Sequence, residues 1–228
     1  MKPLILGNGL LGSEIRKQTG WRCLDHSEFD IMTFPYKPGK SVKMEIKEDV
    51  IINCVGYTKT YDNNKPENYA LNYIAVLGLV GYCKDENKKL VHISTDYLYA
   101  GSVENATEKD LPVPVATWYG YYKMLADAHI SQWSGHYLIC RGTHKPYPFP
   151  FDVGWTNQVG NFDYVNVIAK LIIKLIEKGA TGLYNVGTER KTMYELASRT
   201  RGVRMAECPV PIVPKNVTMN LDKLNNFL

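Results

Sequence analysis

Short apolar runs alternate with segments of helical periodicity along almost the whole chain, and this alternation constrains the fold more than any other feature of the sequence. Strands that alternate with helices in this way pair in parallel, with right-handed crossovers. The pattern therefore predicts an α/β fold with a doubly wound parallel sheet, the Rossmann fold. The predicted strands are residues 3–6, 22–24, 50–55, 90–94, 137–140 and 183–186, and the predicted helices are 11–18, 66–84, 119–132 and 164–178, with shorter ones at 194–200 and 221–228.

Three glycines directly follow the first predicted strand. Gly7, Gly9 and Gly12 form a Gly-x-Gly-x-x-Gly pattern between that strand and a helix that begins near Leu10 and Leu11, which is the context a dinucleotide-binding fingerprint requires. The first glycine allows a tight turn, the second lets a pyrophosphate approach, and the third lets helix and strand pack closely. A glycine-rich turn without a ligand is the alternative. The position at a strand-to-helix junction favours cofactor binding.

The end of the second predicted strand bears on which cofactor binds. Asp25 could hold the ribose hydroxyls of NADH, although it lies closer to Gly12 than is usual, and it could also be a simple turn aspartate. His26 and Ser27 could instead receive the 2′-phosphate of NADPH. The absence of an arginine here argues against strict NADPH dependence. We therefore expect NADPH or NADH as the cofactor.

A candidate catalytic pair lies at the start of the third long helix. Tyr119 and Lys123 are four residues apart and share one helix face. A neighbouring ammonium favours the charged form of a phenol, so Lys123 is expected to bring the pKa of Tyr119 from about 10 towards working pH. Because the chain has 16 tyrosines, a chance surface pair is the alternative. Ser94 and Thr95 end the fourth strand, and Thr95 is favoured to orient a substrate carbonyl.

With these residues assembled, the chain resembles the extended short-chain dehydrogenases and, among them, the dTDP-4-dehydrorhamnose reductase family. Residues 94–97, followed by Gly101, are similar to the family's Ser-Thr-Asp-Tyr-Val-Phe-x-Gly segment. Tyr119 and Lys123 match its Tyr-Gly-x-x-Lys motif. The resemblance spans nearly the whole chain, and it implies that Thr95, Tyr119 and Lys123 are the catalytic residues.

The same resemblance implies the rest of a site. The cofactor is expected to contact Gly7, Gly9, Leu10, Leu11, Gly12, Asp25, His26, Ser27, Cys54, Val55, Gly56, Tyr57, Asn72, Tyr119 and Lys123. The substrate is expected to contact Thr95, Asp96, Tyr97, Arg141, Thr143 and Trp155.

The family implies NAD(P)H-dependent reduction of a nucleotide-linked 4-keto sugar, an oxidoreductase step of carbohydrate biosynthesis. One alternative is a nucleotide-sugar epimerase or dehydratase with tightly bound NAD. Another, of a different class, is a non-catalytic NADP-binding regulatory subunit like that of methionine adenosyltransferase. The presence together of Thr95, Tyr119 and Lys123 counts against a purely regulatory role.

The two halves of the chain differ in how well they match the family. We expect residues 1–142 to form the NAD(P)-binding Rossmann domain and residues 143–228 a reduced, small C-terminal substrate-binding lobe, with segments that return to the Rossmann core, effectively as one structural unit. Where the family has a full helix, residues 143–162 contain prolines, which exclude regular structure, and recurrent large aromatic residues. We interpret this segment as a substrate-facing loop. A surface excursion whose aromatics pack on the core is equally compatible, and the identity of the sugar stays open.

The composition of the chain bears on which classes of binding partner it can have. The net charge of +4 arises from 27 basic and 23 acidic residues without long runs, which favours neither nucleic acid nor a membrane surface as a partner. Five scattered cysteines without a CxxC pair argue against a disulfide framework and a zinc site and favour the cytoplasm, and an immediate strand leaves no room for a signal peptide. Histidines 92, 129, 136 and 144 lack metal-ligand spacing and are assigned to structure or surface. An apolar stripe on 66–84 or 164–178 could support a homodimer.

Overall fold

A six-stranded parallel sheet forms the centre of the molecule. The computed structural model describes residues 2–34, 46–133 and 136–228, and within them the strand order is β10-β5-β4-β3-β1-β2. This order confirms the predicted doubly wound fold, and each predicted strand of the sheet is present. The strands are β1 (Leu4–Leu6), β2 (Cys23–Leu24), β3 (Val50–Asn53), β4 (Lys89–Ile93), β5 (Tyr137–Arg141) and β10 (Gly182–Asn185).

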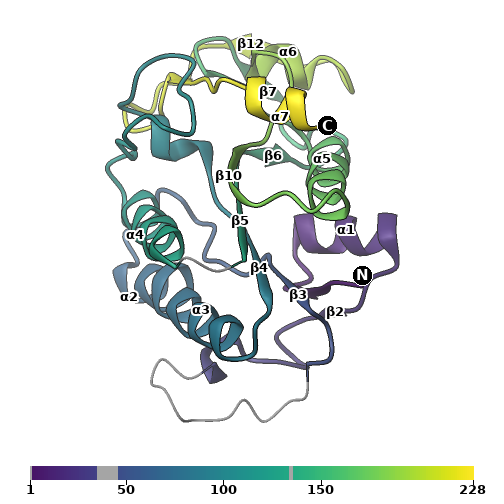
Figure 1. The fold of residues 1–228 in the computed structure, drawn as a ribbon. Helices are drawn as coiled ribbons and strands as arrows, with labels where there is room; N and C mark the ends of the chain where they lie inside the picture. Colours follow the sequence, from purple (N-terminus) through teal and green to yellow (C-terminus); the bar gives the residue numbers. More distant parts are fainter. Residues whose placement is uncertain (1, 35–45, 134–135) are drawn as a thin grey trace.

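Helices cover both faces of this sheet (Figure 1). On one face α1 (Leu10–Thr19) packs against α5 (Val165–Glu177), and the apolar residues of α5, among them Ile168 and Ile172, are buried in the core. The stripe on 164–178 is therefore covered within the chain and is not free for a partner. The other face carries α2 (Lys65–Tyr69), a π-helical segment η2 (Ala70–Ile74), α3 (Ala75–Asp85) and α4 (Trp118–Gln132), beside the 3-10 turn η1 (Ile31–Thr33).

A smaller lobe covers the carboxyl-terminal ends of the central strands (Figure 1). It has a core of its own, formed around Phe162, Tyr164 and Leu196. By contrast, α5 and β10 belong to the core of the central sheet. The remaining elements are η3 (Asp96–Tyr99), β6 (His144–Lys145), β7 (Val153–Trp155), β8 (Val159–Gly160), β9 (Asp163–Tyr164), β11 (Lys191–Thr192), α6 (Met193–Ala197), β12 (Arg204–Ala206), β13 (Asn216–Val217) and α7 (Asp222–Phe227).

The segment 143–162 is more regular than its composition predicts. The expectation that prolines exclude regular structure throughout is wrong, because β6, β7 and β8 lie in it. The prolines at 146, 148 and 150 fall between β6 and β7, so ladder pairing stops there and resumes where backbone N–H groups are available again. Phe149 is buried in the lobe core, whereas Tyr147 and Phe151 are exposed. Between residues 143 and 162, all of which the structure describes, there is no helix.

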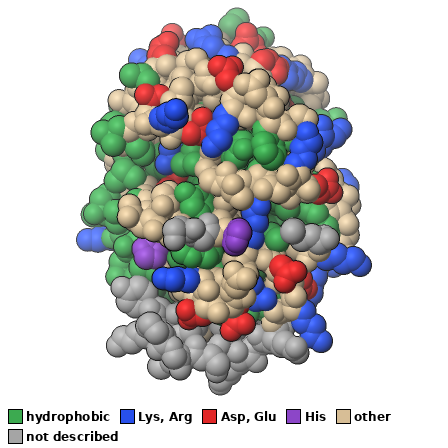
Figure 2. Space-filling view, viewed as in Figure 1, with side chains coloured by type: hydrophobic (Ala, Val, Ile, Leu, Met, Phe, Trp, Pro, Cys, Tyr) green, Lys and Arg blue, Asp and Glu red, His purple; other side chains and the backbone are tan. Residues whose placement is uncertain are grey.

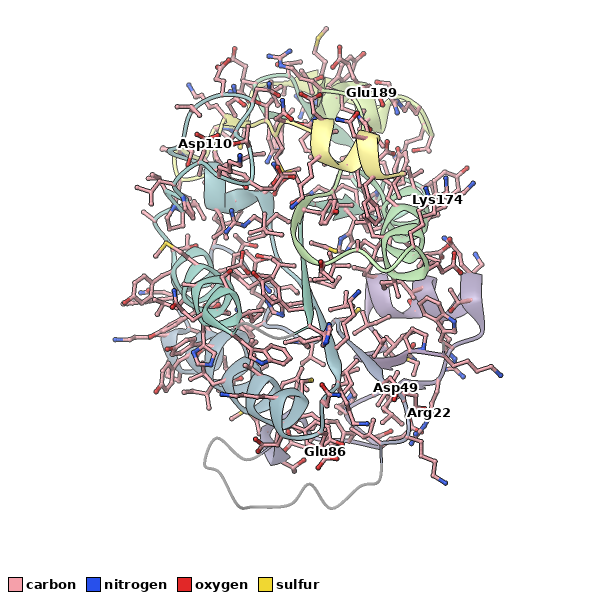
Figure 3. The ribbon with its side chains drawn as sticks, viewed as in Figure 1. Arg22, Asp49, Glu86, Asp110, Lys174 and Glu189 are labelled. Atoms are coloured by element: carbon pink, nitrogen blue, oxygen red, sulfur yellow. The ribbon has the colours of Figure 1, made fainter. Side chains whose placement is uncertain are left out.

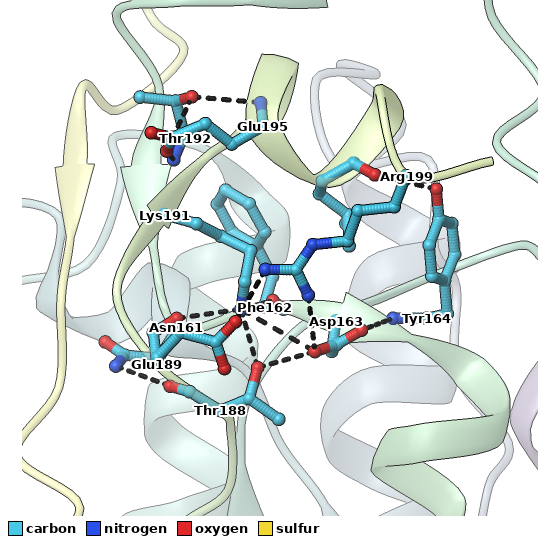
Figure 4. Close-up of polar contacts among 11 residues, drawn as sticks. Asn161, Phe162, Asp163, Tyr164, Thr188, Glu189, Lys191, Thr192, Glu195 and Arg199 are labelled. Atoms are coloured by element: carbon cyan, nitrogen blue, oxygen red, sulfur yellow. Dashed lines mark hydrogen bonds and ion pairs between the residues drawn. The ribbon is translucent and has the colours of Figure 1, made fainter. Parts of the chain in front are cut away.

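The buried side chain of Lys191 connects several segments of the lobe by hydrogen bonds (Figure 4). Lys191 Nζ lies 3.0 Å from the Phe162 carbonyl, 2.6 Å from Thr188 Oγ1 and 2.7 Å from the Glu189 carbonyl, and it pairs with the Asp163 carboxylate at 3.6 Å. An ammonium has three N–H donors, and these contacts use all of them. Lys191 therefore stabilises the lobe and is not a candidate ligand-binding cation.

The two ends of the sheet differ in what surrounds them. Arg22 and Asp49, which precede β2 and β3, lie at the end of the sheet away from the lobe, whereas Glu189 lies in the lobe, at the opposite end of the molecule (Figure 3).

On the face seen in Figure 2, basic and acidic side chains are interspersed. None of the helices in the described part of the chain is long and apolar enough to cross a membrane. The same residues contain no group of three or more His, Cys, Asp or Glu that could hold a metal.

Candidate active site

A cavity of about 410 Å³ opens where the strand order reverses, between the carboxyl ends of β1 and β3. Open α/β sheets bind ligands at this switch point. Its walls come from four strand ends: residues 9–11 after β1, 54–56 after β3, 93–95 at the end of β4 and 142–145 after β5. Tyr119 and Lys123 of α4 complete it.

The glycine turn has the shape that a pyrophosphate needs. Gly7 has a φ of +97°, and a Cβ at Gly12 would lie 1.9 Å from the Gly7 carbonyl oxygen, so neither position tolerates a side chain. A Cβ at Gly9 would meet no atom of the described residues within 4 Å, and no side chain among them caps the N-terminus of α1 there. The N–H groups at the start of α1 are thus open to an anion. This turn fits the dinucleotide predicted from the sequence.

The loop after β3 is held by Asn72. Asn72 Oδ1 accepts from the Tyr57 N–H at 3.0 Å, and Asn72 Nδ2 donates to the Tyr57 carbonyl at 3.0 Å. Asn72 is 1% exposed and lies in η2, the π-helical interruption of the predicted helix, a feature often found at functional sites. Cys54, Val55, Gly56 and Asn72 all line the cavity. The Tyr57 ring points elsewhere, since its hydroxyl donates to Asp62.

The end of β2 does not reach this cavity. Asp25 Oδ1 accepts hydrogen bonds from the Ser27 hydroxyl at 2.6 Å and from the Ser27 N–H at 2.9 Å, and these bonds hold the pKa of Asp25 below its usual value. His26 is exposed beside them. Contacts of Asp25, His26 and Ser27 with the adenosine end of a cofactor stay predictions.

The three predicted catalytic residues meet in the cavity. Thr95 follows β4 and accepts from the Tyr97 N–H at 3.2 Å, which caps η3 and fixes the position of its hydroxyl. Tyr119 and Lys123 are one turn apart on α4, whose first residue follows the cap Thr117. All three line the same cavity. Ser94, by contrast, donates to Asp127 at 2.9 Å, so its hydroxyl already has a structural partner.

The electrostatics of the pair differ from the prediction. Burial raises the pKa of Tyr119 to about 12, partly offset by hydrogen bonding to the Thr95 side chain. Lys123 Nζ lies 2.6 Å from the Ile93 carbonyl and 3.1 Å from His92 Nε2. Burial lowers the pKa of Lys123 to about 8. The expectation that Lys123 lowers the pKa of Tyr119 is wrong for this arrangement, because the lysine is directed at β4.

On the substrate side, Tyr97 and Thr143 line the cavity and Asp96 lies next to them. Asp96 is fully buried, and its Oδ1 accepts from the Thr143 hydroxyl at 2.6 Å. Asp96 Oδ2 has no hydrogen-bond partner among the described residues. Burial raises the pKa of Asp96 to about 6. A buried carboxyl with an unused oxygen beside a cavity is a suitable acceptor for a ligand hydroxyl.

The elevated pKa of Asp96 makes stability depend on pH in a window that starts near 4. Between about pH 4 and pH 6 the Asp96 carboxyl binds more protons in the folded state than in the unfolded state, so the contribution of Asp96 to wild-type stability falls as pH rises through this window. Asp96→Asn cannot ionise, and we expect its stability relative to wild type to increase over the same window by at most about 3 kcal/mol, the equivalent of two pKa units. Urea unfolding at each pH measures this difference. A difference that is independent of pH would contradict the assignment.

Two predicted substrate contacts lie outside the cavity. Arg141 is 5% exposed, and its guanidinium donates to Asp127 Oδ2 at 2.9 Å and to the Tyr99 hydroxyl at 2.9 Å. Asp127 is buried on α4 and needs a cation, so Arg141 is used inside the protein. Trp155 packs against the lobe core. Substrate contact by Arg141 and Trp155 is therefore not supported by their positions.

Two residues that the sequence interpretation did not assign to the site do line it. His144 and Lys145 form β6 and face the cavity, although His144 was assigned to structure or surface. Burial lowers the pKa of His144 to about 4 and also lowers the pKa of Lys145. They directly follow Arg141–Thr143 at the carboxyl end of β5, and this position was the available signal, because ligands bind at that edge of the sheet.

Comparison with known proteins identifies the family. The family described as "RmlD substrate binding domain" matches residues 1–144. The chain belongs to the RmlD family. The matched region contains the glycine turn, Thr95, Tyr119 and Lys123, so the resemblance noted in the sequence is confirmed for the part of the chain that carries these motifs.

Individual relatives agree with this assignment. The dTDP-4-dehydrorhamnose reductase of Mycobacterium tuberculosis (strain H37Rv) is 29% identical over 103 residues, which cover 44% of this chain and 33% of the relative. The "Probable low-salt glycan biosynthesis reductase Agl14" of Haloferax volcanii is 24% identical over 168 residues, 64% of this chain and 56% of that protein. The chain thus spans about a third and about half of the lengths of these two relatives.

Solved structures share the fold over a longer stretch. The crystal structure of dTDP-4-dehydrorhamnose reductase from Bacillus anthracis in complex with NADP superposes with a TM-score of 0.81. It is 24% identical, and the match covers 100% of this chain and 94% of that one. At this identity the superposition establishes a shared fold, which includes both the central Rossmann-type sheet and the lobe.

Proposed function

We propose that this protein is an NAD(P)-dependent oxidoreductase of the extended short-chain dehydrogenase type that reduces a 4-keto sugar carried on a nucleoside diphosphate. The observation that carries the proposal is the convergence of Thr95, Tyr119 and Lys123 on one cavity with the open glycine turn at its edge. A binding module would need the glycine turn alone. The hydroxyl, phenol and amine together supply what carbonyl reduction requires.

Each residue has one task in this reduction. The bound nicotinamide supplies the hydride that the carbonyl carbon receives. Thr95 donates a hydrogen bond that orients the carbonyl oxygen, and Tyr119 gives its hydroxyl proton to that oxygen as negative charge develops on it. Lys123 Nζ donates to the Ile93 carbonyl and contacts His92 on β4, and its side towards the cavity is left for a ribose hydroxyl of the cofactor.

The substrate class follows from the opposite wall and from the relatives. Asp96, Tyr97 and Thr143 provide acceptors and donors for sugar hydroxyls, and Lys145 provides a cation for an anionic group. The mycobacterial relative and the Bacillus structure both carry the name dTDP-4-dehydrorhamnose reductase, which supports a nucleotide-linked 4-keto sugar as the substrate.

For the cofactor, the observations support either NADPH or NADH. The Bacillus structure contains NADP, which supports NADPH. The Asp25 carboxylate at the end of β2 is kept ionised by Ser27 and would repel a 2′-phosphate, which supports NADH. The cofactor preference of this chain is therefore part of the assay.

We place the enzyme in the cytoplasm, where thiols stay reduced, because all five cysteines are free. The exposed rings of Tyr69 and Tyr121, on the contacting helices α2 and α4, support association into a homodimer.

A panel of nucleoside-diphosphate 4-keto sugars, each incubated with NADPH and with NADH, tests the proposal. We expect at least one sugar to be reduced, as seen by loss of the absorbance of the reduced nicotinamide. NAD that copurifies and is regenerated in each cycle would instead indicate an epimerase or dehydratase. Cofactor binding without oxidation by any sugar would indicate a regulatory NADP-binding module.

A further inference from the structure

Lys123 Nζ has two polar contacts on β4, and the position of the ring proton on His92 decides whether both can be hydrogen bonds. Lys123 is 5% exposed, and its Nζ lies 2.6 Å from the Ile93 carbonyl and 3.1 Å from His92 Nε2. The carbonyl accepts from an ammonium and from a neutral amine alike. His92 Nε2 accepts from Lys123 when the ring proton is on Nδ1 and donates to it when the proton is on Nε2.

Asn53, the last residue of β3, decides which of these holds. Asn53 Oδ1 faces the Val55 N–H at 3.0 Å, and because a backbone N–H only donates, the orientation of the amide is fixed. The Nδ2 end, a donor, then faces His92 Nδ1 at 3.3 Å. His92 is 1% exposed, and burial lowers its pKa well below the usual value, so the ring is neutral. Asn53 therefore favours the proton on Nε2, directed at Lys123.

This tautomer conflicts with an ammonium at Lys123. Two N–H groups would then oppose each other across the 3.1 Å contact between Lys123 and His92. If the ring switches tautomer, the Nδ1–H opposes Asn53 Nδ2 instead. A neutral amine at Lys123, which accepts from the His92 Nε2–H, leaves both contacts paired. The structure thus favours the free amine by geometry, in addition to burial.

We propose that His92, held by Asn53, is a positioning residue that stabilises the unprotonated form of Lys123 and so lets this lysine release its proton into the cavity. The catalytic meaning of this step rests on the proposed function. When Tyr119 has given its proton to the substrate, a phenolate is left. Lys123 and Tyr119 line the same cavity, so a proton passed from the Lys123 ammonium by solvent in that cavity restores the phenol and leaves the amine. The His92 Nε2–H then donates to that amine, and solvent later returns the proton.

Other groups around Lys123 act in the opposite direction. Asp127, one turn further along α4, and Cys54, after β3, both favour the ammonium form of Lys123, and Asp127 does so more strongly. Tyr119 lies on the same helix, one turn before Lys123. Asp127 Oδ1 is 4.0 Å from His92 Nε2, beyond hydrogen-bond range, and has no hydrogen-bond partner among the described residues. Burial outweighs the influence of both groups, and the pKa of Lys123 falls to about 8.

The test is a titration of Lys123 by lysine-selective ¹⁵N NMR on the full chain without cofactor, with the signal assigned by Lys123→Met. In Asn53→Ala the ring can carry its proton on Nδ1 and accept from the ammonium, so we expect the Lys123 midpoint to rise by about one pH unit, the value of one hydrogen bond. His92→Gln offers a carbonyl acceptor and should raise the midpoint too, and it replaces Asn53→Ala if that variant does not fold. Cys140→Ala, a truncation of a buried side chain on β5, is the matched control and should leave the midpoint unchanged.

A midpoint that stays at the wild-type value in both variants would show that burial alone sets it and would overturn the proposal. In turnover assays the alkaline limb of the kcat profile should move with the NMR midpoint, while KM for the cofactor changes less. The NMR titration uses no substrate. Absence of turnover would therefore contradict the proposed function, whereas an unmoved midpoint would contradict this inference.

Discussion

Tyr119→Phe is expected to lower turnover by about 100- to 10,000-fold, the usual contribution of a positioned proton donor. The variant keeps the ring, so packing at the start of α4 is preserved, and the affinity for NADPH or NADH should change little. Proton delivery to the developing alkoxide is lost with the Tyr119 hydroxyl, and the Thr95 hydroxyl is needed to orient the carbonyl. Steady-state reduction of a 4-keto sugar and fluorescence titration of the reduced cofactor measure the two effects separately.

Tyr121→Phe is the matched control for this variant. Tyr121 is 44% exposed on the same helix, and its ring lies outside the cavity. It should retain wild-type turnover. Near-normal activity of Tyr119→Phe would refute the assignment of the proton donor, and an equal loss in both variants would point to a disturbed helix.

The parts of the fold and site that could be predicted are those with short-range causes. Gly7 is fixed by its positive φ and Gly12 by its close approach to the Gly7 carbonyl, both of which are local, and Tyr119 and Lys123 share a helix face because of their spacing. The strands were recognisable because a parallel sheet buries both faces and therefore needs continuous apolar runs. Thr95 was placed correctly in the cavity because it follows such a run.

The parts that could not be predicted depend on distant partners. Arg141 looked available to a substrate because nothing local to it shows that Asp127, from another element, pairs with it. The pKa of Tyr119 was expected to fall from the Lys123 charge alone, whereas burial and the contact of Lys123 with His92 arise only when β4 and α4 pack. Sequence spacing shows which residues share a face. It does not show how deeply the face is buried or which buried partner competes for each charge.

The most consequential buried partnership in the fold is that of Asp127 with Arg141. Both side chains are at most 6% exposed, and the Asp127 carboxylate also accepts from the Ser94 hydroxyl. Arg141 continues the network to the Tyr99 hydroxyl, which in turn donates to Asn185. The network therefore connects α4, which carries the catalytic pair, to the ends of β4, β5 and β10.

We expect Asp127→Ala to reduce the free energy of unfolding by about 3–5 kcal/mol, because it leaves the Arg141 guanidinium buried without a counter-charge. Urea unfolding followed by circular dichroism measures the loss. Asp127→Ala combined with Arg141→Met should recover much of it, since the second change removes the unpaired charge and keeps an unbranched side chain. Arg201→Ala, which breaks the exposed ion pair with Asp152, is the control and should cost at most about 1 kcal/mol. If the double variant were less stable than Asp127→Ala alone, the loss would come from packing, and the charge pair would not be what joins α4 to the sheet.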